Sequence, residues 1–110
     1  MAELQQSDVV RLIGDVLTEL DLLMASPDLS DSDFKDVRKL RRALDGLQGK
    51  IVAQEFKENT KAFQNAAERL KKVNADLEQT ISDVEKVAAT IESITTLISA
   101  AEKLLAIGIV

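Results

Sequence analysis

An unbroken heptad pattern between residues 63 and 105 constrains this chain more than any other feature. Apolar residues recur there at alternating steps of three and four, the spacing of a helix that packs lengthwise against other helices. Thr80 is the only polar residue at these positions. The first position reads Phe63, Leu70, Leu77, Val84, Ile91, Ile98 and Leu105, and the second reads Ala66, Val73, Thr80, Val87, Ile94 and Ala101. The pattern predicts architecture and carries no chemistry of its own.

Two shorter amphipathic stretches precede the heptads. The first predicts a helix over residues 7–25, with Ser7 as its N-cap and an end imposed by Pro27, because a residue before proline disfavours the helical region. The second predicts a helix over residues 31–57, begun by a capping box at Ser30. Gly46 and Gly49 lie inside it and are compatible with a bend, a tight crossing or a short turn.

The heptad stretch predicts a third helix over residues 60–107, since no glycine or proline interrupts it. A straight helix over residues 63–107 would be about 68 Å long. A compact chain of this size has a radius of gyration of only about 13 Å. We therefore expect a single all-α domain, residues 1–110, an antiparallel bundle of three helices with a projecting third helix. The alternative is a four-helix bundle with a break near residues 74–82.

The composition removes most catalytic chemistry. The chain has no histidine, the commonest general base and transition-metal ligand, and no cysteine for thiolate chemistry. The acidic loop at residues 26–33 lacks the glycine and the final glutamate of a calcium-binding loop. Helical carboxylate pairs such as Asp15 and Glu19 are expected to be surface charges with no apolar pocket to raise a pKa. We expect no enzyme, metal, cofactor or small-molecule substrate.

Charge follows the chain in three blocks. Residues 1–33 and 73–110 are acidic and residues 34–72 are basic, with a net charge of −5 overall. This pattern predicts that the middle helix packs beside both the first and the last. The basic cluster Arg38, Lys39, Arg41 and Arg42 is expected to pair with the acidic first helix. The net charge and the absence of aromatic residues in the cluster argue against nucleic acid as a partner.

From residue 81 onward the third predicted helix is apolar over most of its circumference, so something must cover it. We expect a non-enzymatic interaction module that self-associates or binds a partner helix through this face. The predicted partner-binding residues are Val84, Val87, Ile91, Ile94, Leu97, Ile98, Ala101 and Leu105.

Two alternative functions stay open. One is a membrane-active protein that uses the apolar segment 94–110; Glu102, Lys103 and the lack of a basic polar face argue against it. The other is a small acidic chaperone-like or antitoxin-like partner of a larger protein. No signal-peptide pattern and no transmembrane segment is recognised, and the expected compartment is the cytoplasm.

Overall fold

The computed structural model describes residues 3–107, and this part of the chain is entirely helical apart from its turns. A short 3₁₀ helix, η1 (Val84–Lys86), leads into the last α-helix. The four α-helices are α1 (Gln6–Met24), α2 (Asp31–Ala53), α3 (Lys61–Glu78) and α4 (Val87–Ala106). The predicted all-α class is confirmed.

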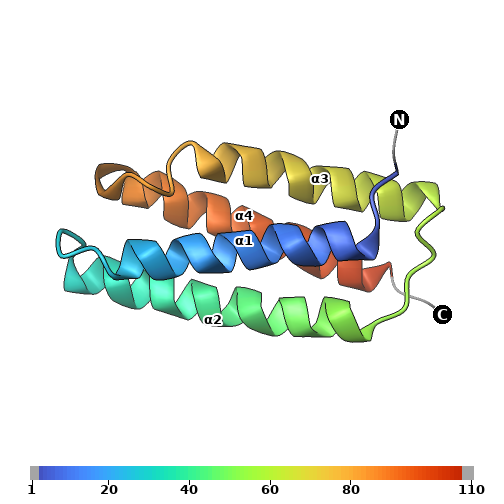
Figure 1. Ribbon diagram of the computed structural model, residues 1–110, viewed down its shortest axis with the longest axis horizontal. Coiled ribbons are helices and arrows are strands. Elements are labelled where there is room, and N and C mark those ends of the chain that lie inside the picture. The colour runs from blue at the N-terminus through green and yellow to red at the C-terminus, as the bar shows by residue number, and fades with distance from the viewer. Residues whose placement is uncertain (1–2, 108–110) are drawn as a thin grey trace.

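The helices form two hairpins that pack against each other (Figure 1). Within each hairpin the helices are antiparallel, α1 with α2 and α3 with α4. Between the hairpins α2 lies beside α4 as predicted, and α1 lies beside α3 along the least extensive of these four seams. Residues 54–60 cross from α2 to α3, so α1 and α3 run in the same direction and end at the same end of the molecule.

The prediction of three helices with a projecting third is wrong. The chain turns after Glu78, and α4 runs back along α3, as in the four-helix alternative. The described molecule measures 44 × 26 × 17 Å, with a radius of gyration of 14.2 Å. A straight helix of about 68 Å does not fit in it.

Polar side chains hold the turn between α3 and α4. Thr80 Oγ1 donates to the Leu77 carbonyl at 3.3 Å and accepts from Thr90 Oγ1 at 2.9 Å, which ties the turn to α4. Asp83 Oδ1 accepts from the Glu85 amide at 3.0 Å and begins η1. These bonds satisfy groups that the interrupted helix leaves free. Folding back also covers α4 on several sides, which its wide apolar surface requires.

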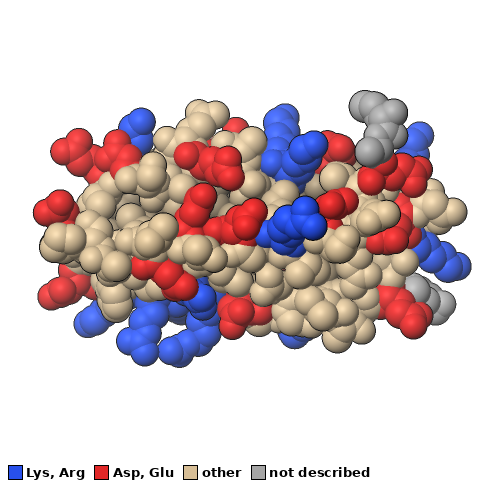
Figure 2. All heavy atoms as spheres, in the orientation of Figure 1, with Lys and Arg blue, Asp and Glu red and all other residues tan. Residues whose placement is uncertain are grey.

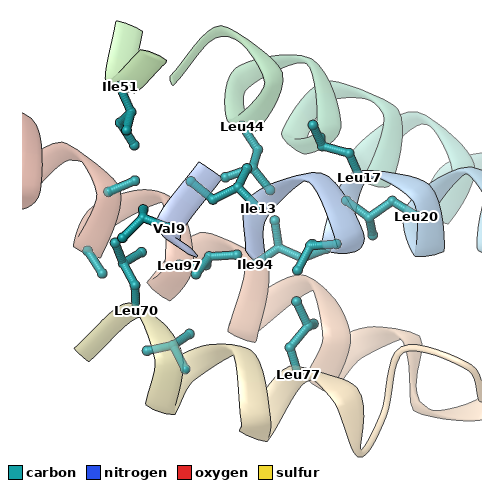
Figure 3. Close-up of a cluster of buried hydrophobic side chains, with 14 of the residues drawn as sticks. Val9, Ile13, Leu17, Leu20, Leu44, Ile51, Leu70, Leu77, Ile94 and Leu97 are labelled. Atoms are coloured by element: carbon teal, nitrogen blue, oxygen red, sulfur yellow. The ribbon is translucent and has the colours of Figure 1, made fainter. Parts of the chain in front are cut away.

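The buried stripe changes phase across this turn. In α3 it contains the first heptad position, Phe63, Leu70 and Leu77. In α4 the first position is only half-buried. The fully enclosed residues of α4 are instead Thr90, Ile94, Leu97, Ala100, Ala101 and Leu104. The turn therefore rotates α4 about its axis, which a continuous helix could not do. Figure 3 shows Ile94 and Leu97 of α4 in one core with side chains of α1 and α2.

Several helix ends differ from the predictions. The N-cap of α1 is Gln5 rather than Ser7, and Asp8 accepts from the Gln5 amide at 2.8 Å. The side chain of Ser30 caps α2 as predicted, by accepting from the Asp33 amide at 3.1 Å. α2 ends at Ala53 rather than at residue 57, and Thr60 caps α3.

The two glycines of α2 mark neither a turn nor a tight crossing within the bundle. α2 is continuous through Gly46 and Gly49, and a Cβ placed on either would have no heavy atom within 4 Å. Both glycines therefore face open space.

Candidate partner-binding site

The bundle itself encloses much of the predicted partner-binding face of α4. Ile94, Leu97 and Ala101 are 0% exposed and belong to the core. A partner can reach these three only if the helices separate. The other five predicted residues are half-buried against the core, namely Val84, Val87, Ile91, Ile98 and Leu105.

One end of the bundle is tied by glutamine side chains; we call it the tied end and define it by Gln6, Gln54 and Gln64. Gln6 Nε2 donates to the carbonyls of Ile51 and Gln54. Gln64 exchanges hydrogen bonds with the Leu4 backbone at 2.8 and 3.0 Å. Gln54 Nε2 donates to the Leu105 carbonyl at 3.0 Å. These bonds connect α1, the end of α2 and the end of α4, and they tie α3 to the segment that precedes α1.

The opposite end, where α1 and α3 finish, is hollowed. A pocket of about 460 Å³ lies there; its lining residues are Glu19, Leu22, Leu23, Ser26, Glu78, Ile81, Ser82 and Val84. Leu23 and Ile81 are 5% and 3% exposed and supply an apolar floor. Leu22 stands at the edge with 69% of its surface exposed. We call this site the seam pocket, because it opens at the end of the sparse α1–α3 seam.

Two glutamates contribute the acidic part of the seam pocket. Burial raises the pKa of the Glu19 carboxyl, and the nearby carboxylates of Glu78 and Asp15 raise it further. The expectation that Asp15 and Glu19 are surface charges without an apolar pocket is therefore wrong for Glu19. Its neighbours are acidic and apolar, and both disfavour the charged form.

Neither glutamate forms an ion pair within the described part of the chain. Among residues 3–107, no lysine or arginine nitrogen lies within 4.0 Å of a carboxylate oxygen of Glu19 or Glu78. The last turns of α1 and α3 contain no basic residue either. The two helix C-termini at this end thus add their partial negative charge to that of the glutamates. Figure 2 shows the hollowed, uncharged area between the ends of α1 and α3, with acidic side chains beside it.

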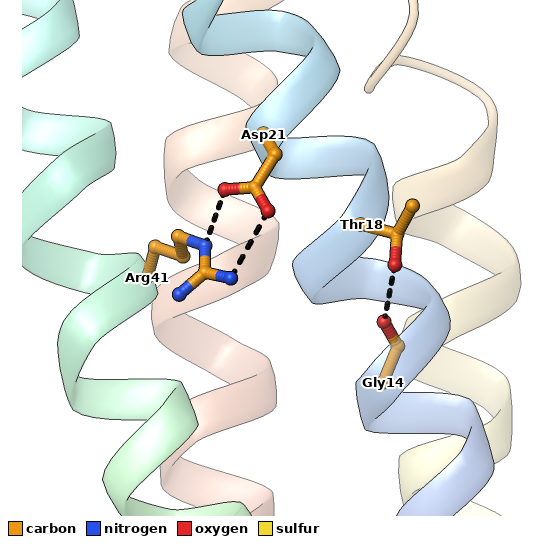
Figure 4. A network of polar contacts seen from close by, with 4 residues as sticks. All are labelled: Gly14, Thr18, Asp21 and Arg41. Atoms are coloured by element: carbon orange, nitrogen blue, oxygen red, sulfur yellow. Dashed lines mark hydrogen bonds and ion pairs between the residues drawn. The ribbon is translucent and has the colours of Figure 1, made fainter.

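The basic cluster of α2 pairs in part with α1, as predicted. Arg41 Nε and Nη2 donate to the two carboxylate oxygens of Asp21 at 2.6 and 3.0 Å (Figure 4). Arg38, Lys39 and Arg42 are exposed. Basic side chains gather along the lower edge of Figure 2, where Figure 1 places α2. The cluster therefore lies on a different part of the surface from the seam pocket.

The seam pocket is not apparent in the sequence, because its residues come from α1, from α3 and from the segments that follow these two helices. The segment after α3 was expected to lie inside a continuous helix. Leu22 was the available signal. It lies off the apolar stripe of α1 formed by Val9, Ile13, Val16, Leu20 and Leu23. An apolar residue off the stripe of an amphipathic helix is expected to face outward.

Within residues 3–107, no helix combines the length and the apolar character needed to cross a bilayer. The same range contains no cluster of three or more acidic, histidine or cysteine residues arranged to hold a metal ion.

Comparison with protein-family models, with curated proteins and with solved structures finds no match to this chain.

Proposed function

We propose that this chain is a non-enzymatic interaction module that binds a segment of a partner protein at the seam pocket. The observation that carries the proposal is the pairing of an exposed apolar residue, Leu22, with a concave apolar floor formed by Leu23 and Ile81. Concave apolar sites with a few polar groups are where proteins bind ligands and partner side chains. The proposed compartment is the cytoplasm, as expected from the sequence.

The contrast between the two ends of the bundle supports this location. Side-chain amides of Gln6, Gln54 and Gln64 satisfy backbone groups at the tied end. The seam pocket leaves apolar surface uncovered and its glutamates without a cation. A partner would bury that surface and balance that charge.

Site-specific photocrosslinking tests the proposal. A photoreactive amino acid at position 22, introduced in cells of the source organism, should form a defined adduct with one polypeptide. Val52 offers a matched control, because it is 59% exposed and lies on α2 outside the seam pocket. The identified polypeptide, once purified, should bind the wild-type chain and bind Leu22→Ser at least tenfold more weakly. The same adducts at both positions, or none at position 22, would contradict the proposal.

Self-association through α4 is the second candidate function. It is favoured by the half-buried residues Ile91, Ile98 and Leu105, which recur every seven positions along one side of α4. Light scattering tests it: a dimer that Ile98→Lys converts to a folded monomer would support this route. A monomer at all accessible concentrations would contradict it.

A further inference from the structure

We infer that the seam pocket accepts a basic amphipathic segment, which places an apolar side chain on the floor of Leu23 and Ile81 and a lysine or arginine against Glu19 and Glu78. This inference rests on the proposed function and adds the chemistry of the partner. It uses three independent features of the end of the bundle that contains the seam pocket: its carboxylates, its helix termini and its apolar floor.

The carboxylates come first. Glu19 is partly buried beside the apolar floor, and Glu78 is exposed on the other side of the pocket. Neither has a basic side chain of the described chain within 4.0 Å. Burial raises the pKa of Glu19, and repulsion from the Glu78 carboxylate raises it further, as expected where acidic groups share a site without an ion pair. A lysine or arginine of a partner would relieve that repulsion, and it would do so next to apolar walls that strengthen the attraction.

The helix termini act in the same direction. α1 ends at Met24 and α3 at Glu78, and residues just beyond both ends, Ser26 and Ser82, line the pocket. The C-terminus of a helix carries about half a negative charge and is stabilised by cations. Neither last turn contains a lysine or an arginine. A partner cation at this position would interact with two helix ends as well as two carboxylates.

The apolar floor explains why the ligand should be a segment rather than a free cation. Leu23 and Ile81 are almost fully buried, whereas Leu22 is 69% exposed at the edge. A free cation would leave the apolar surface wet, and a purely apolar segment would desolvate the glutamates without compensation. A helix with leucine and lysine one turn apart provides both kinds of contact on one face.

A pair of synthetic peptides tests the inference. The probes are a labelled 18-residue helical peptide of leucine and lysine, with leucines on one face, and its counterpart with glutamate in place of lysine. Binding is measured by fluorescence anisotropy against the wild-type chain and three variants. Glu19→Gln/Glu78→Gln removes the pocket charges, and Leu22→Ser removes the apolar edge. Glu55→Gln/Glu102→Gln makes the same charge change at exposed positions near the tied end.

The leucine–lysine peptide should bind the wild type, and Glu19→Gln/Glu78→Gln should raise its dissociation constant by about tenfold, as the loss of two ion pairs implies. Glu55→Gln/Glu102→Gln should change it by less than about twofold, and the leucine–glutamate peptide should bind at least about tenfold more weakly. Circular dichroism of each variant confirms that it is folded.

The remaining outcomes separate this inference from the proposed function. If both peptides bind equally well and only Leu22→Ser weakens the binding, the inference of a basic partner is overturned. The proposal that the seam pocket is the binding site would then still stand. Binding that neither pocket variant weakens, or no binding of either peptide, would overturn both. If the wild-type chain is a dimer and Glu19→Gln/Glu78→Gln dissociates it, a second copy of this chain occupies the seam pocket. That result would overturn the inference of a separate basic partner.

Discussion

Alanine at Gly46 and Gly49 should stabilise this protein, because both glycines lie inside a continuous helix and face open space. Glycine in an exposed helix interior costs about 1 kcal/mol relative to alanine, mainly in backbone entropy. A Cβ at either position would meet no heavy atom within 4 Å, so no steric cost opposes the gain. The double variant Gly46→Ala/Gly49→Ala should therefore gain about 2 kcal/mol, or about 8 °C in Tm for a domain of this size.

Urea denaturation followed by circular dichroism measures this gain, and Gly14→Ala supplies a contrast. A Cβ at Gly14 would lie 3.2 Å from Gln48 Nε2, which donates to the Val10 carbonyl at 3.0 Å. The alanine must displace that side chain, so Gly14→Ala should gain less than Gly46→Ala. Destabilisation by Gly46→Ala or Gly49→Ala would refute the reasoning, since it would mean that this face of α2 is bent or covered.

Three other substitutions, the first with an exposed control, probe the core and the α1–α3 seam. Ile94→Asp should cost at least about 4 kcal/mol and abolish the cooperative thermal transition, because Ile94 is 0% exposed. Lys86→Asp should not lower stability, because Lys86 is exposed at the N-cap of α4, where aspartate is a favoured residue. Asn74→Ala should stabilise by about 1 kcal/mol in urea denaturation, because Asn74 Oδ1 is buried without a hydrogen-bond partner from the described protein and because alanine favours the interior of α3; a loss of stability would indicate that this oxygen is bonded. Glu19→Gln should stabilise by a few tenths of a kcal/mol at pH 7, where the ionised carboxylate is disfavoured in the fold. That advantage should vanish below about pH 4, where glutamate is protonated in both the folded and the unfolded chain; a constant advantage at all pH values would contradict the raised pKa.

Periodicity and capping chemistry made the helices predictable. The apolar stripes gave three of the helix positions directly, and Ser30 and Pro27 marked the boundary between the first two. Charge patterning correctly placed α2 beside both α1 and α4, and the pairing of Arg41 with Asp21 follows it. Apolar periodicity and helix caps are local patterns, and charge pairing depends only on the sign of the charge along each helix. All three can therefore be recognised from the sequence alone.

The turn at residues 79–83 was harder, because the heptad phase runs through it without interruption. A continuous stripe is equally compatible with one long helix and with two helices that fold together. Tertiary packing decides between the two. α4 is apolar on several sides, and after the turn its buried residues occupy other heptad positions than those of α3. Thr80, the only polar residue of the stripe, was the local sign, and its bonds to Leu77 and Thr90 show its role in the turn.

The seam pocket depends on that turn and could not be predicted without it. Ile81, Ser82 and Val84 reach the pocket only because the chain leaves α3 after Glu78. The raised pKa of Glu19 depends in turn on the nearby Glu78 carboxylate and on burial at the pocket. Sequence spacing relates residues within one helix, whereas this site joins two helices that are separated by α2 in the chain.

The central claim is that α4 folds back along α3, so that the bundle itself encloses Ile94, Leu97 and Leu104. The chain has no cysteine, so cysteines introduced at the exposed positions Ala62 and Glu102 would carry two spin labels without interference. Ala62 lies in the first turn of α3 and Glu102 near the end of α4, so both positions lie toward the tied end. Their distance by pulsed electron paramagnetic resonance should be comparable to the 26 × 17 Å cross-section of the molecule. A distance of about 60 Å, the length of a straight helix between them, would contradict the account.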